Sequence, residues 1–229
     1  MGRVASRLSA AIVLMSLGYI LAGCQVFSGP VVEPQSKIVL WNGQDLSGWK
    51  PFNPGEKADA KEKSIWSVKN GAIHCEGKPD GYMRTTTAYS NYHLHLEWRW
   101  PVGKANNSGV FLHLNGPDKL WPRCIETELK HNNAGGIVLI HGTGVTIDGE
   151  NKQDLQEKYV ILDKKKPSSE KPVGQWNVLD VYCGNGTIRN FVNGVLQNEG
   201  TDITDNSGWI GLQNEGPVEF RNIYLEPLK

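Results

Sequence analysis

The 229-residue sequence predicts an all-β protein folded as a sandwich of two antiparallel sheets. Beyond residue 37, no segment of twelve or more residues keeps the apolar period of an amphipathic helix. Short apolar runs are instead separated by seven Asn-Gly or Asp-Gly pairs, which are typical of tight hairpin turns. Many short strands joined by tight turns favour a two-sheet sandwich, and we find no internal repeat or second domain.

The clearest strand covers residues 92–100, where apolar and polar side chains alternate. Its even positions are aromatic or leucine, whereas its odd positions are His93, His95, Glu97 and Arg99. Since successive side chains of a strand point to opposite faces, we expect one face in the core and the other to be polar. Further strands are expected at residues 72–76, 109–114, 125–130, 136–140, 178–183, 187–192, 209–213 and 218–225.

The start of the chain resembles the signal peptide of a bacterial lipoprotein. Two arginines precede an uncharged apolar stretch at residues 8–20, which is too short to span a bilayer as a helix. The tetrapeptide Leu-Ala-Gly-Cys that ends at Cys24 is similar to a lipobox, which implies cleavage before Cys24 and its lipidation. Gln25, rather than Asp, favours the outer membrane. We therefore expect a signal peptide (1–23), a lipidated tether (24–37) and one domain (38–229), anchored in the bacterial cell envelope.

Charge and cysteine content exclude several classes of function. The chain has 24 basic and 24 acidic side chains, so it has no net positive charge that would attract nucleic acid. The cysteines beyond Cys24 are Cys75, Cys124 and Cys183, whose wide spacing fits no zinc motif, and we expect buried free thiols. No phosphate loop, dinucleotide fingerprint or nucleophile elbow is present. The chain is therefore not expected to carry out the redox step that would produce a keto sugar.

A series of short motifs carries a family resemblance. They are residues 40–49 (LWNGQDLSGW), 96–99 (LEWR), 107–110 (NSGV), 175–177 (QWN), 208–213 (GWIGLQ) and 219–223 (EFRNI). In this order they resemble the 3-keto-disaccharide hydrolase domain family, over nearly the whole predicted domain. The resemblance implies a concanavalin A-like jelly roll, chemistry on glycosides oxidised at C3, and a location in the bacterial envelope. One motif departs from the family: Glu128 and His131 stand where many members have Gln and Asp.

Glu126 and Glu128 are the leading candidates for catalysis. In a strand they share one face, with Thr127 and Leu129 on the other. Two neighbouring carboxylates can raise each other's pKa, divide acid and base roles, or bind a divalent cation. His131, shortly afterwards, is a candidate acid or a third metal ligand. A divalent metal cofactor bound by these three residues is therefore one of the alternatives.

Other polar side chains are candidates on weaker grounds. If the polar face of residues 92–100 belongs to the site, Glu97 is a third acid and Arg99 binds hydroxyls or a developing oxyanion; otherwise both form surface ion pairs. The candidates for substrate binding are His95, Asn107, His113, Trp121 and Gln213.

Three functions remain open. The leading one is cleavage of 3-keto-glycosides or 3-keto-disaccharides, by elimination and hydration, with carbohydrate and membrane as the only expected partners. The second is a laminarinase-like retaining glycosidase, whose acidic motif the segment from Glu126 to His131 repeats without its last carboxylate. The third is a non-catalytic sugar-binding lipoprotein whose tryptophans stack on sugar rings.

Overall fold

The computed structural model describes residues 30–54 and 65–228. The predicted signal peptide and Cys24 lie outside these residues. The described residues form strands, turns and loops without a helix, which confirms the all-β prediction. Accordingly, none of them belongs to a helix long and apolar enough to cross a membrane.

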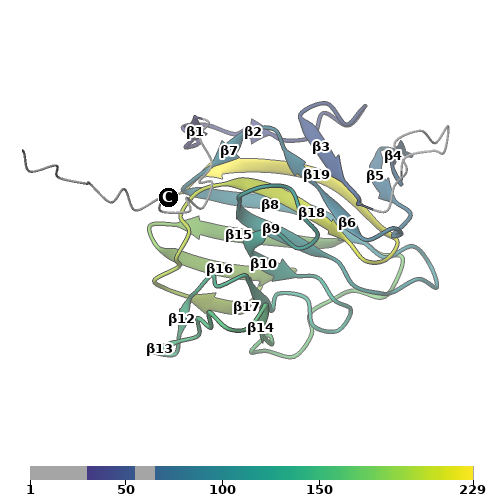
Figure 1. Cartoon of the computed structure of the whole chain (residues 1–229). Coiled ribbons are helices and arrows are strands. Elements are labelled where there is room, and N and C mark those ends of the chain that lie inside the picture. Colours follow the sequence, from purple (N-terminus) through teal and green to yellow (C-terminus); the bar gives the residue numbers. More distant parts are fainter. Residues whose placement is uncertain (1–29, 55–64, 229) are drawn as a thin grey trace, which may run out of the picture.

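Two antiparallel sheets lie face to face (Figure 1). The first sheet has the order β14 (Tyr159–Leu162), β11 (Ile137–Ile140), β10 (Arg123–Glu128), β9 (Gly109–Asn115), β18 (Trp209–Asn214), β6 (Gly81–Thr85) and β3 (Trp49–Phe52). The second has the order β17 (Val195–Gly200), β16 (Thr187–Val192), β15 (Asn177–Gly184), β8 (Tyr92–Arg99), β19 (Val218–Pro227), β5 (Ala72–Cys75) and β4 (Trp66–Lys69), with β2 (Ile38–Val39) also paired to β19. We call them the seven-stranded and the eight-stranded sheet.

Two small strand pairs flank the sandwich. β12 (Thr146–Ile147) pairs with β13 (Glu150–Asn151), and β1 (Val31–Val32) pairs in parallel with β7 (Ala88–Tyr89). β1 lies within the range that the sequence analysis assigned to the tether, and the backbone N–H of Ser90 also donates to the carbonyl of Val32. The contacts of the domain therefore begin before residue 38.

The core lies between the two sheets. The apolar face of β8 contributes Tyr92, Leu94, Leu96 and Trp98, all fully buried, which confirms the alternation predicted for this strand. Apolar side chains of β9, β10 and β11 meet them from the seven-stranded sheet. Cys124 and Cys183 are buried free thiols, as expected, and Cys75 is also buried.

Four of the Asn-Gly and Asp-Gly pairs form the hairpin turns that the sequence predicts. In each, both residues have positive φ, the conformation that Asn, Asp and Gly adopt most readily and that a type I′ turn requires. They join β4 to β5, β12 to β13, β15 to β16 and β16 to β17. Much of the eight-stranded sheet is thus built from local hairpins.

Candidate active site

The alternation of β10 separates the core from the candidate site. The Thr127 hydroxyl donates to the Asn190 side-chain oxygen (3.0 Å) inside the sandwich, and Leu129 packs in the core. Glu126 and Glu128 therefore point the other way, to the outer face of the seven-stranded sheet. This is the orientation predicted from the sequence.

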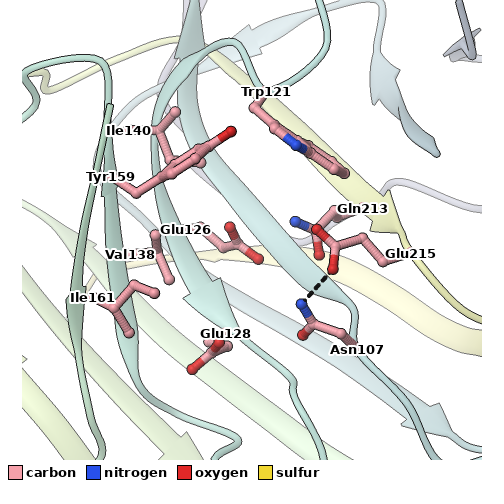
Figure 2. Close-up of a pocket in the computed structure, with 10 residues that line it drawn as sticks. All are labelled: Asn107, Trp121, Glu126, Glu128, Val138, Ile140, Tyr159, Ile161, Gln213 and Glu215. Carbon is pink, nitrogen blue, oxygen red and sulfur yellow. Dashed lines mark hydrogen bonds between the residues drawn. The ribbon is translucent and has the colours of Figure 1, made fainter. Parts of the chain in front are cut away.

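On that face the two glutamates line a cleft of about 180 Å³ (Figure 2). Its lining consists of Asn107, Trp121, Glu126, Glu128, Val138, Ile140, Tyr159, Ile161, Gln213 and Glu215. Half of the ten predicted site residues thus meet here: the two glutamates and three of the predicted substrate-binding residues. The lining contains no lysine or arginine.

Glu126 is a buried acid, and no lysine or arginine of the described residues lines its cleft. Its side chain is 3% exposed, and no described residue donates a hydrogen bond to its carboxylate. Burial, and then the charges of Glu128 and Glu215, raise the pKa of Glu126 well above its ordinary value. The surroundings of Glu126 therefore favour its protonated form.

Gly109 makes room for the Glu126 carboxylate. It lies on β9, the strand beside β10, and a Cβ atom there would lie 1.8 Å from Oε1 of Glu126. Every other residue type would push the carboxylate aside. The glycine thus helps to set the position of the acid.

The other two acids each accept a hydrogen bond from an asparagine. Nδ2 of Asn107 donates to Glu215 (2.6 Å), and Nδ2 of Asn133 donates to Glu128. Burial raises the pKa of Glu128, and the Asn133 hydrogen bond opposes this rise. The cleft therefore holds three acids in different environments, which is how proteins separate acid from base roles.

Two amide oxygens in the cleft lack a partner. The side-chain oxygens of Gln213 and Asn107 are buried, and no described residue donates to them. Figure 2 shows the Gln213 amide turned toward the same part of the cleft as Glu126 and Glu215. Unpaired buried acceptors are costly, so this arrangement suits a ligand that brings hydroxyl donors.

Sequence reasoning missed Glu215 and the four apolar lining residues. Glu215 follows Gln213 by two positions, but it lies just beyond the end of β18, where alternation no longer predicts the side of the sheet. Tyr159 and Ile161 belong to a four-residue apolar run that the sequence analysis left unassigned. The available signal was a short run of aromatic and β-branched residues, which is typical of a strand.

Glu97 and Arg99, predicted to be catalytic, lie on the wrong sheet for this cleft. Both are on β8 of the eight-stranded sheet, where Glu97 accepts from Nε of Arg221 (2.7 Å) and Arg99 pairs with Glu219. Glu97 and Arg99 thus form cross-strand ion pairs, which was the alternative interpretation of these two residues. The sequence could not show this, because alternation identifies a polar face but not the sheet to which it belongs.

His95 also lies away from the cleft. Its Nδ1 is 2.8 Å from Asp180, which Nε2 of His93 contacts at the same distance, and its ring stacks on Tyr224. It lines a separate hollow of about 540 Å³ beside β2 and β19. The prediction that it shares a site with Glu126 is wrong.

A β-bulge makes the prediction for His113 wrong. His113 has a positive φ of 50°, and the pairing of β9 with both neighbouring strands shifts here. Its ring therefore points into the interior, against Tyr92 and Cys183, and Nδ1 contacts the Asp205 carbonyl (2.6 Å). Burial lowers the pKa of His113 to about 4, so it is a neutral core residue.

His131 lies beyond the end of β10, and its Nδ1 is 3.2 Å from Glu170. It is not part of the cleft lining, so the three predicted metal ligands do not converge. Within the described part of the chain, no group of three or more His, Cys, Asp or Glu side chains is arranged to hold a metal ion. These residues therefore do not fit a three-ligand metal centre.

Comparison with known structures supports the fold. A Parabacteroides distasonis protein, provisionally assigned as a glycosyl hydrolase, aligns at TM-score 0.60 and 22% identity, over 85% of this chain and 94% of its own. LamA from Z. galactanivorans, crystallised with laminaritriose and laminaritetraose, aligns at TM-score 0.51 and 11% identity, over 78% and 92%. An endo-acting O-glycanase structure from human gut microbiota aligns at TM-score 0.52 and 11% identity, over 89% and 96%. At these identities the similarity establishes the jelly-roll fold alone.

Sequence comparison is more specific. No curated protein is significantly similar to this chain. Residues 36–226 match the family described as 3-keto-alpha-glucoside-1,2-lyase-like domain, which covers nearly all of the sandwich. The family resemblance identified from the motifs is thus confirmed, and the carbohydrate-active class follows from it. The chain belongs to the 3-keto-alpha-glucoside-1,2-lyase-like domain family.

Proposed function

We propose that this domain cleaves the glycosidic bond of glycosides oxidised at C3, by elimination followed by addition of water. The observation that carries the proposal is the pair of unlike acids in the cleft. Glu126 is buried and tends to hold its proton, whereas Glu215 accepts a hydrogen bond from Asn107. An acid and a base beside unpaired hydroxyl acceptors are what such a cleavage requires.

A ketone at C3 determines the chemistry. It acidifies the hydrogen at C2, so a general base can remove that proton and the electrons move onto the C3 oxygen. The C1–O bond, β to the ketone, then breaks as the leaving oxygen gains a proton. The product is an enone with a double bond between C1 and C2, and addition of water to it completes a net hydrolysis.

We assign the base role to Glu215 and the acid role to Glu126. Glu215 takes the C2 proton, and Glu126 gives its proton to the leaving oxygen. In the second step, Glu126, now a carboxylate, takes a proton from water as the hydroxide adds to C1, and Glu215 returns its proton to C2. Both groups thereby recover their starting states.

Glu128 and Gln213 have supporting roles in this scheme. The charge of Glu128 is the second cause of the raised pKa of Glu126, so it helps keep the acid protonated. The unpaired side-chain oxygen of Gln213 accepts from a sugar hydroxyl, and its amide N–H can donate to the C3 oxygen. Arg99 and His131, which the sequence analysis assigned to these steps, lie outside the cleft.

The direct test is turnover of a 3-keto-glucoside beside its unoxidised parent. We expect cleavage of the keto sugar only, because only its C2 hydrogen is acidic. Cleavage of both would indicate an ordinary glycosidase of the laminarinase type. Cleavage of neither, with binding, would indicate a sugar-binding module.

We also propose that the domain is held at the bacterial envelope by lipid on Cys24. This rests on the lipobox, because acyl chains on one terminus can anchor a protein whose own surface is polar. Cys24→Ala should move the protein from the membrane fraction to the soluble fraction. A variant that still sediments with membranes would show that the anchor lies elsewhere.

A further inference from the structure

The cleft has two chemically different sides. Figure 2 shows Val138, Ile140, Tyr159 and Ile161 on one side of Glu126, with Gln213, Glu215 and Asn107 on the other. The four apolar residues form two cross-strand pairs between β11 and β14, Ile140 with Tyr159 and Val138 with Ile161. We call these four residues the apolar platform.

The platform adjoins the catalytic acid directly. Glu126 is the cross-strand partner of Val138, so Ile161, Val138 and Glu126 form one row across three neighbouring strands. Residues opposite one another on one sheet face are in side-chain contact range. The leaving group, whose oxygen Glu126 protonates in the proposed mechanism, therefore begins at the edge of the platform.

The outer part of the platform is open. Ile161 is 62% exposed and Tyr159 37% exposed, and β14 is the edge strand of its sheet. Trp121 lies at the same end of the cleft as Tyr159 (Figure 2), with a positive φ of 56° and its ring edge-to-face with Phe111 (6.2 Å). A contiguous apolar surface of this kind beside a polar cleft is typical of a ligand-binding site rather than of an ordinary strand edge.

The sugar and the leaving group cannot both lie on the polar side. The cleft volume of about 180 Å³ is well below the roughly 300–1,000 Å³ of pockets for drug-sized ligands, so part of the substrate extends beyond it. The unpaired oxygens of Gln213 and Asn107 call for hydroxyl donors, which places the sugar ring on their side. The group that leaves from the Glu126 side is then directed across the apolar platform.

Building on the proposed function, we infer that the preferred substrates are 3-keto-glycosides with an aromatic aglycone, and that Tyr159 and Ile161 determine this preference. A second sugar would place most of its hydroxyls against apolar carbon, because the Tyr159 hydroxyl is the one polar side-chain atom of the four platform residues. The nearby Nζ of Lys158 lies 4.9 Å from the centroid of the Tyr159 ring. A planar aromatic group instead buries apolar area there and meets the rings of Tyr159 and Trp121. The occupant that fits the platform is therefore a phenol-type leaving group.

The test compares phenyl and methyl 3-keto-glucoside with the wild type, Ile161→Ser and Tyr159→Ser. Phenol leaves more easily than methanol, so each variant is compared with the wild type on the same substrate. We expect each variant to lose about ten-fold in kcat/KM on the phenyl substrate, through KM, a factor equal to about 1.4 kcal/mol of lost contact. On the methyl substrate the loss should stay below two-fold. Val39→Ser is the matched control, because Val39 is 63% exposed and lies on the other sheet.

Equal losses on both substrates, or no loss on the phenyl substrate, would overturn the inference. Calorimetric binding to Glu126→Gln separates this inference from the proposed function. Tighter binding of the phenyl than of the methyl 3-keto-glucoside, reduced by Ile161→Ser, supports the platform even if the wild type turns over neither compound. Equal binding of the two would contradict it even if both are cleaved.

Discussion

The outer faces of both sheets carry acidic side chains, but the neighbours of these acids differ between the two sheets. On the eight-stranded sheet, Glu97 pairs with Arg221 and Asp180 lies between two histidines. On the seven-stranded sheet, Glu126 and Glu128 face neither lysine nor arginine across the cleft. Burial raises the pKa of Glu126, whereas at Glu97 the effect of burial is outweighed by the hydrogen bonds from Asn222 and Arg221, which lower its pKa. Paired acids at a sheet surface contribute structure, whereas unpaired buried acids are characteristic of reactive sites.

The largest expected effect is loss of turnover in Glu215→Gln. Gln keeps the size of the side chain but cannot take a proton, and loss of general-base catalysis costs roughly two to four powers of ten in rate. Steady-state kinetics on a 3-keto-glucoside measures the effect. Glu199→Gln, at an exposed acid of the eight-stranded sheet, should leave the rate unchanged. Full activity of Glu215→Gln would show that another residue acts as the general base.

Gly109→Ala should reduce turnover by at least about ten-fold while the protein stays folded. The new methyl group occupies the position of the Glu126 carboxylate, which can swing away because it ends a flexible side chain. Small displacements of a catalytic group are costly in rate. In a Glu126→Ala background the same change should have little further effect on rate, since interacting sites are not additive. Additive losses would show that Gly109 acts through something other than Glu126.

Glu126→Gln should stabilise the fold, and more so as the pH rises. The folded state raises the pKa of Glu126, so folding favours its protonated form, and the wild type loses stability as the pH rises from the ordinary value of 4.5 through the raised one. Gln has no proton to lose, so its advantage should be small near pH 4 and larger near pH 8. Each kcal/mol gained raises Tm by about 2–4 °C in a domain of this size. Thermal melts that show no pH-dependent difference would contradict the raised pKa.

Arg99→Gln should give the smallest effect. It removes the ion pair with Glu219 and the contact of the guanidinium with the Trp176 ring, 4.5 Å away. Partly exposed pairs of this kind contribute about 1 kcal/mol or less. Denaturant unfolding should show this small loss while kcat/KM stays the same. A large loss of activity with normal stability would return Arg99 to the site.

The sequence predicted the fold and one face of the site because both depend on local rules. Asn-Gly turns and the alternation of residues 92–100 gave the sandwich, and the spacing of Glu126 and Glu128 gave their common direction. Strand order is not local, so the same alternation could not tell that Glu97 belongs to the other sheet. The prediction for His113 was wrong for another reason: the β-bulge at this residue reverses the side of the sheet to which the side chains point from there on.

The central claim is that Glu126 is reactive and Glu97 structural, and one paired measurement tests it directly. Turnover of a 3-keto-glucoside is measured for Glu126→Gln and Glu97→Gln, each with its thermal melt. We predict that Glu126→Gln loses at least about a hundred-fold in kcat with an equal or higher Tm, while Glu97→Gln keeps its kcat with an equal or slightly lower Tm. The opposite pattern, full activity in Glu126→Gln and loss in Glu97→Gln, would place the reactive face on the eight-stranded sheet.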